Sequence, residues 1–183
     1  MTCDLYQRVL GGAWRTLADP VRSAHLAGRE KRGVFRIVHG TGCLARCMIR
    51  WSRLPQAACA AATRLRIIAE KDGECWERQF DSQSFTTLQW AEDGGLLVER
   101  FGSWELRFAL RADGAALVYE QRGARLCLGP LRLPMPPAFA PQVKATESCD
   151  GPARVHVAVT VTLPFIGLLI GYDGHLDVEA IGG

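Results

Sequence analysis

The sequence lacks the short motifs that identify several enzyme classes. It contains no GxSxG, HExxH, GxGxxG or Walker phosphate-binding loop, and no cysteine and histidine spacing of the kind that holds zinc. Hydrolases, metalloproteases and nucleotide-binding proteins carry such motifs because each one places specific atoms around a substrate or cofactor. We therefore assign no catalytic residue, no metal and no cofactor from the sequence, and the sequence favours binding without catalysis but does not decide whether the protein is an enzyme.

The cysteines do not form a pattern typical of a secreted protein. There are seven, an odd number, and no CxxC occurs. A disulfide-stapled extracellular domain favours an even number. The first residues hold Asp4 and no apolar run, so we expect no secretory signal. These features predict free thiols and a cytoplasmic location.

Long hydrophobic runs are also missing. The most apolar window, Val157 to Gly171, is shorter than the ~18–20 residues that a membrane-spanning helix needs, and it contains Pro164 and Gly167. We expect no transmembrane segment. Before Pro164 the window alternates between valine and smaller or polar residues, which is the period of a half-buried strand. The four valines at 155, 157, 159 and 161 are predicted to share one buried face.

Charge of one sign is not in excess. The chain has 22 basic and 19 acidic residues, interleaved, for a net charge of +3. Proteins that bind nucleic acid usually concentrate lysine and arginine in a stripe, so we expect no nucleic-acid partner. Hydrophobic residues make up 48% of 183 residues, which is enough for one domain with a sizeable core. We predict a single domain over residues 1–183.

The N-terminal third of the chain carries the helical patterns. Residues 1–28 have apolar residues at helical spacing and a restart at Asp19-Pro20, where we expect Asp19 to be the N-cap. Residues 29–59 read as a strand followed by a short basic amphipathic helix over 43–53, with arginines 46, 50 and 53 on one face. This helix could pack on a sheet, cover a barrel mouth or lie on anionic lipid.

From residue 60 to 183 the chain reads as an antiparallel β-meander. Turn residues recur about every ten positions, which is the spacing of a sandwich or barrel. Asp-Gly, the strongest short hairpin signal, occurs five times, and weaker reversals fall at Asp81-Ser82, Gly102-Ser103 and Arg122-Gly123. The Asp-Gly pairs are at 72–73, 93–94, 113–114, 150–151 and 173–174. The stretch PLRLPMPPAFAP is expected to be a stiff loop.

These patterns together predict a mainly β fold of the α+β type. We expect a curved antiparallel meander, closed or nearly closed into a barrel of about 8–10 strands. N-terminal helices precede it, and the 43–53 helix packs across it.

One strand carries an unusual combination of side chains. In CWERQF, Trp76, Arg78 and Phe80 share a face, so a guanidinium lies between two aromatic rings. If this face points inward, Arg78 needs a partner, because a buried unpaired charge is very costly. Glu99 is the expected partner, and a ligand anion is the alternative.

The candidate site collects the polar residues of the predicted strands. Three interpretations stay open: a buried ion pair with tyrosines that satisfy the core, a polar end that holds the head group of a lipophilic ligand, and acid–base catalysis. Histidines such as His25 are interpreted as structural. The candidate ligand-binding residues are Arg78, Glu99, Tyr119, Tyr172, Trp76 and Glu147.

Several segments taken together resemble a known family. YQRVLGGAW, CWERQF, VERFG, LGPLRLPMP and LPFIGLLIGYDGHL are similar to an uncharacterised bacterial family of domains of unknown function, number 4166, over about residues 5 to 178. Members occur alone or C-terminal to saccharopine-dehydrogenase-like Rossmann domains, and the family has no established activity. The residues at its motif positions are Trp76, Arg78, Phe80, Glu99, Phe101, Gly102, Pro164, Gly167, Tyr172 and Gly174.

The sequence therefore supports two functions of different kinds. The first is non-catalytic binding of a small hydrophobic or amphipathic molecule in a barrel pocket. The alternative, implied by the resemblance, is an accessory or substrate-shaping domain for a Rossmann-fold oxidoreductase partner. A deep apolar cavity favours the first, and a filled core with a large exposed apolar patch favours the second.

Overall fold

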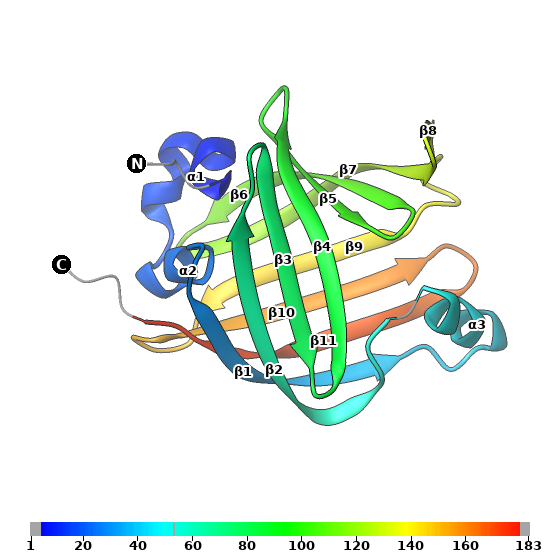
Figure 1. Ribbon diagram of the computed structural model, residues 1–183, viewed down its shortest axis with the longest axis horizontal. Coiled ribbons are helices and arrows are strands. Elements are labelled where there is room, and N and C mark those ends of the chain that lie inside the picture. The colour runs from blue at the N-terminus through cyan, green and yellow to red at the C-terminus, as the bar shows by residue number, and fades with distance from the viewer. Residues whose placement is uncertain (1–4, 53, 180–183) are drawn as a thin grey trace.

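Ten antiparallel strands close into a barrel in the computed structural model, which describes residues 5–52 and 54–179 (Figure 1). The described strands are β1 (Glu30–His39), β2 (Ala58–Ala69), β3 (Gly73–Phe80), β4 (Gln83–Glu92), β5 (Leu96–Phe101), β6 (Trp104–Asp113), β7 (Ala116–Leu128), β8 (Leu131–Pro134), β9 (Gln142–Cys149), β10 (Arg154–Leu163) and β11 (Gly167–Asp177). The helical elements are α1 (Leu5–Leu10), the 3-10 helix η1 (Gly11–Thr16), α2 (Asp19–Ala24) and α3 (Cys43–Trp51).

The barrel is an up-and-down meander with one strand outside the ring. Strands β1 to β7 pair with their neighbours in chain order, β7 then pairs with β9, and β9 continues to β10 and β11. The ring closes because β11 pairs with β1. Among the described strands, the short strand β8 pairs only with the C-terminal part of β7, residues 125–128. The predicted meander and the predicted number of barrel strands are both confirmed.

The helices lie at opposite ends of the barrel. Figure 1 shows α1 and α2 together at one end and α3 at the other. The first group contacts β4, β5, β6, β9 and β10, whereas α3 contacts β11. The predicted restart at Asp19-Pro20 is confirmed, but Asp19 is the first helical residue and Ala18 is the N-cap. The Asp19 side chain instead pairs with Arg22.

The core lies between the helix pair and the inner faces of the strands. Tyr6, Trp14 and Val21 from the N-terminal helices belong to the same buried cluster as residues from nearly every barrel strand. On β10 the valines share the predicted inward face. Val155 is fully buried, while the three valines that follow it are half-buried because they line a cavity.

Four of the five Asp-Gly pairs lie at the turns where the sequence predicts them. The pair Asp173-Gly174 was predicted as a hairpin turn, and this is wrong, because it lies inside β11. Gly174 faces Phe35 across the β1–β11 pairing, and a Cβ atom there would lie 2.2 Å from the Val34 carbonyl oxygen. The glycine is therefore required by close approach of two strands and not by a turn.

Two further local predictions are corrected. Arg122-Gly123 does not reverse the chain. It lies within β7 at a β-bulge, where the register with β6 shifts between Arg107 and Phe108. The proline-rich stretch is not a loop throughout, because Leu131–Pro134 forms β8, and only its second half is irregular. Both cases use glycine or proline at positions where a strand is bent or ends.

Candidate functional site

The barrel encloses a cavity of about 130 Å³ whose walls are mostly apolar. Its lining comes from strands all round the ring, from Met48 of α3 and the following Ser52 at one end, and from Ala24 of α2 at the other. Charged, amide and phenol groups interrupt the apolar wall at a few positions. These are Arg78, Gln89, Glu99, Tyr119, Glu147 and Tyr172. An apolar cavity with a few placed polar groups is the usual form of a small-molecule site.

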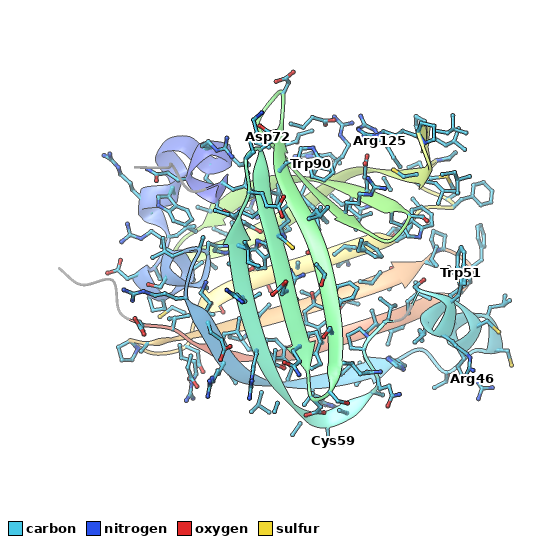
Figure 2. The ribbon with its side chains drawn as sticks, in the orientation of Figure 1. Arg46, Trp51, Cys59, Asp72, Trp90 and Arg125 are labelled. Atoms are coloured by element: carbon cyan, nitrogen blue, oxygen red, sulfur yellow. The ribbon has the colours of Figure 1, made fainter. Side chains whose placement is uncertain are left out.

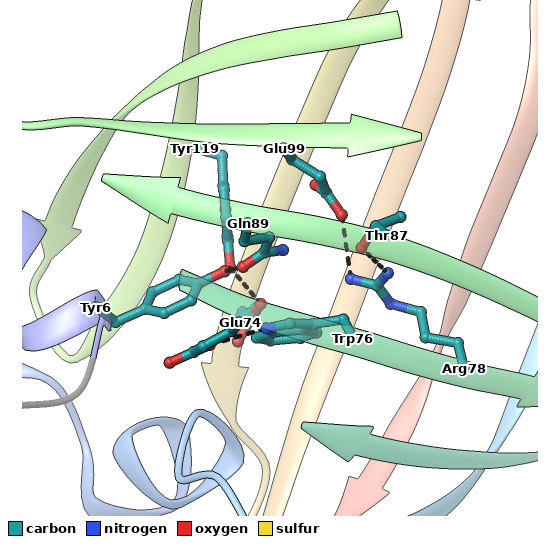
Figure 3. A network of polar contacts seen from close by, with 9 residues as sticks. Tyr6, Glu74, Trp76, Arg78, Thr87, Gln89, Glu99 and Tyr119 are labelled. Carbon is teal, nitrogen blue, oxygen red and sulfur yellow. Dashed lines mark hydrogen bonds and ion pairs between the residues drawn. The ribbon is translucent and has the colours of Figure 1, made fainter. Parts of the chain in front are cut away.

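Arg78 reaches into this cavity from the middle of β3. Alternation along the strand places it on the inner face between Trp76 and Phe80, as predicted. Its guanidinium donates to the Thr87 hydroxyl at 2.8 Å and to Glu99 Oε1 at 3.3 Å (Figure 3). The guanidinium carbon also lies 4.9 Å from the centre of the Trp76 ring, a cation–π geometry.

The Arg78–Glu99 pair is partly open to the cavity. The side chains are 13% and 19% exposed, respectively. Burial disfavours the charged guanidinium, but the nearby Glu99 carboxylate offsets this, and the pKa of Arg78 is raised. The arginine therefore remains charged, with a partner, on a wall of the cavity.

A second polar group lies at the end of the cavity beneath the N-terminal helices. Glu147 of β9 accepts from the Tyr119 hydroxyl at 2.7 Å, and its other oxygen lies 2.8 Å from Nε2 of His25, a fully buried residue. Burial raises the pKa of Glu147, but the electrostatic interaction with His25 and the hydrogen bonds to His25 and Tyr119 outweigh it, so the pKa is lowered. Glu147 is therefore an ionised carboxylate inside the barrel.

Tyr6 links this group to the neighbouring strands. Its hydroxyl donates to Gln89 Oε1 at 2.8 Å and lies 3.1 Å from the Tyr119 hydroxyl (Figure 3). Each hydroxyl has one proton, and we place that of Tyr119 on the bond to the Glu147 carboxylate, the stronger acceptor. Burial and the Glu147 charge raise the pKa values of both tyrosines well above 10, so both stay protonated.

Two further hydrogen bonds, both to Glu74, lie where β3 meets the N-terminal helices, close to the turn between β2 and β3. The indole Nε1 of Trp76 donates to Glu74 at 2.9 Å, and the other Glu74 oxygen accepts from the backbone N–H of Leu5 at 3.4 Å. The start of α1 is thereby attached to β3. This contact holds the helices over this end of the barrel.

All six residues predicted from the sequence line the cavity, but they do not form one cluster. Trp76, Arg78 and Glu99 come together, and Tyr119 and Glu147 form a separate pair. Tyr172 packs its ring on Phe35 and Phe80, with ring centres 6.1 and 6.0 Å away. Burial raises the pKa of Tyr172 to about 12.

Five polar residues of the network were not among the predicted site residues: Tyr6, His25, Glu74, Thr87 and Gln89. Thr87 and Gln89 alternate with Phe85 on β4, and this inward polar pattern was readable in SFTTLQW. His25 was interpreted as structural, and its bond to Glu147 agrees with that. The sequence did not indicate that Tyr6 belongs to the site, because it does not show where α1 packs on the barrel.

Helix α3 lies at the other end of the cavity. Its inner face packs Ala45 and Ile49 on Leu163 and Leu169, which forms a second small core. Its outer face exposes Leu44 and Trp51, and Figure 2 shows Trp51 and Arg46 at the periphery of the molecule. Arg53, predicted on the same basic face, lies outside the described residues.

The described part of the chain was also compared with the requirements of a metal site and of a membrane-spanning helix. Within residues 5–52 and 54–179, no group of three or more histidine, cysteine or acidic side chains is arranged to hold a metal ion. None of the helices in these ranges has both the length and the apolar composition that a membrane crossing demands.

Comparison with known proteins gives one match that shows a family. A family model described as "Domain of unknown function (DUF4166)" matches residues 17–176. No curated protein matches the chain. Among solved structures, one similar chain is described as "REP1-NXSQ fatty acid transporter", with 12% identity, a TM-score of 0.36, and coverage of 87% of this chain and 99% of that one. A likeness this distant carries no argument about function.

Proposed function

This chain belongs to the DUF4166 family, whose description gives no activity, and we propose from the geometry of its own residues that it binds a small molecule. The ligand is hydrophobic or amphipathic and lies inside the barrel. The observation that supports this is the cavity itself: about 130 Å³, mostly apolar, with the Arg78–Glu99 pair on its wall. Binding without catalysis is the simpler role, because every ionised group of the site already has a structural partner.

The size of the cavity limits the ligand. A cavity of ~150 Å³ holds benzene, whereas pockets for drug-sized ligands measure about 300–1,000 Å³. A group of about six carbon atoms therefore fits in this cavity. A longer tail would extend along the apolar wall towards α3, past Met48 and Leu163.

The site residues take distinct roles in this proposal. Trp76 and Tyr172 supply aromatic surface beside the guanidinium, and Arg78 and Glu99 offer a donor and an acceptor to the head group. Tyr119 and Glu147 close the cavity beneath the helices. The hydrogen bond between them, and the bond of Glu147 to His25, hold this part of the wall in place.

One observation favours the alternative of an accessory domain for a Rossmann-type oxidoreductase. Large apolar side chains are exposed at the α3 end, including Trp51 at 76% and Phe165 at 91%. Such a surface suits a protein partner. We favour ligand binding because an apolar cavity with a few placed polar groups is the usual form of a small-molecule site.

A cavity-filling variant tests the proposal. Ala145 on β9 lines the cavity and lies opposite Tyr119 in the β7–β9 pairing, so Ala145→Leu should fill the cavity and exclude a ligand. Native mass spectrometry of freshly purified protein should show a bound small molecule on the wild type and none on Ala145→Leu. Ala62→Leu, on the exposed outer face of β2, is the matched control and should keep the bound mass. Wild-type protein without a bound mass, or an equal bound mass on Ala145→Leu, would contradict the proposal.

A further inference from the structure

The positive charges around the cavity are already matched by carboxylates. Among the described residues of the lining, Arg78 is the single cationic side chain, and Glu99 and Glu147 are both acidic. Arg78 is paired with Glu99 at 3.3 Å. Behind the wall, His25 lies 2.8 Å from Glu147, so a proton on this histidine would also be matched.

This arrangement offers no free cation to an incoming anion. A ligand carboxylate beside Arg78 would lie near Glu99, and the two like charges would repel each other in a wall of low polarity. It could displace Glu99 only by leaving that carboxylate without its partner, which is costly at 19% exposure. A ligand ammonium would meet the same obstacle beside Arg78.

An uncharged polar group meets no such obstacle. The guanidinium has five N–H groups, and the contacts to Thr87 and Glu99 use two of them. Tyr172 also lines the cavity, and a tyrosine hydroxyl can both donate and accept. A hydroxyl, carbonyl or amide could bond to these groups while the ion pair stays intact.

We infer that the ligand is a neutral amphiphile, with an alcohol, carbonyl or amide head group, and that the Arg78–Glu99 pair discriminates against fatty-acid anions. This inference rests on the proposed function and specifies its ligand class. Glu99 is then a specificity-determining residue, because its charge is what makes Arg78 unavailable to an anion.

The test compares two ligands with the same tail. Wild-type protein is titrated at pH 7.5 with 1-octanol and with octanoate, and binding is followed by NMR shifts of the tryptophan indole N–H groups, since Trp76 lines the cavity. We expect 1-octanol to bind at least about tenfold more tightly. In Glu99→Gln the amide keeps the shape of the side chain but removes its charge. The affinity for octanoate should then rise about tenfold or more, so that it equals or exceeds the affinity for 1-octanol.

The matched control is Glu77→Gln, which removes one negative charge from the exposed outer face of β3, the strand that carries Arg78. It should leave the order of the two ligands unchanged. Tighter octanoate than 1-octanol binding to the wild type, or an unchanged octanoate affinity in Glu99→Gln, would overturn the inference while ligand binding stands. Failure of both ligands to bind the wild type would overturn the proposed function itself.

Discussion

Replacing Glu147 with leucine should lower the free energy of unfolding by about 3–5 kcal/mol. The carboxylate is the acceptor for the Tyr119 hydroxyl and the partner of Nε2 of His25. Leucine would leave Nε2 of His25 buried without this partner and would leave the Tyr119 hydroxyl with only its longer contact to Tyr6, and each such loss costs about 1–3 kcal/mol. The additional apolar area of leucine recovers only part of this. Urea unfolding of the two proteins at pH 7 measures the difference.

Glu147→Gln is the control, because its amide keeps the size and can still accept from Tyr119. We expect it to lose only about 1–2 kcal/mol at pH 7. A Glu147→Leu variant within about 1 kcal/mol of the wild type would show that the network does not stabilise the barrel.

The pH dependence of stability should report the charge of Glu147. The pKa of this carboxyl is lowered in the folded protein, mainly by His25 and Tyr119 acting against burial. A lowered folded-state pKa contributes stability that is fully present above the unfolded-state value of about 4.3 and is lost as the pH falls through the folded-state pKa. The stability gap between wild type and Glu147→Gln should therefore shrink as the pH falls below about 4.

Replacing Arg78 with methionine should destabilise the protein by about 2–4 kcal/mol. Methionine fills much of the same space, but it leaves Glu99 without its partner and Thr87 without its donor. Breaking a buried ion pair costs about 3–5 kcal/mol. We expect a value towards the lower part of this range because both side chains face a cavity and are 13% and 19% exposed.

A double-mutant cycle separates the pair from the rest of the site. Adding Glu99→Gln to Arg78→Met removes the unpaired carboxylate, so the double variant should recover about half or more of the loss. Additive losses in the two single variants would show that the 3.3 Å contact contributes no coupling energy. Thermal and urea unfolding on the four proteins complete the cycle.

The sequence predicts the strand contributions to the site better than the helix contributions. Alternation along β3 and β5 is enough to put Arg78 and Glu99 on inner faces, and a meander brings those strands near each other. The bond between His25 and Glu147 joins positions 122 residues apart, and the bond between Tyr6 and Gln89 spans 83. Such contacts depend on where helices dock on a closed barrel, which no local pattern encodes.

The corrected turns show the limit of dipeptide signals. Asp72-Gly73 and Asp173-Gly174 are the same pair of residues, yet one lies at a hairpin and the other inside a strand. At the second position glycine is needed because the backbone of Phe35 lies too close for a side chain. The need for a small residue is visible in the sequence, but its cause is a strand more than a hundred residues away.

Closure of the ring between β1 and β11 has a consequence for how the chain is made. Arg32 pairs with Asp177, so the first and last strands of the barrel can meet only after residue 177 has been synthesised. Until then β1 carries an open edge that can pair with other chains. Long-range closure of this kind also makes folding slow, on the order of milliseconds to seconds. Truncation before β11 should therefore leave the β1 edge open and yield aggregates instead of a smaller folded unit.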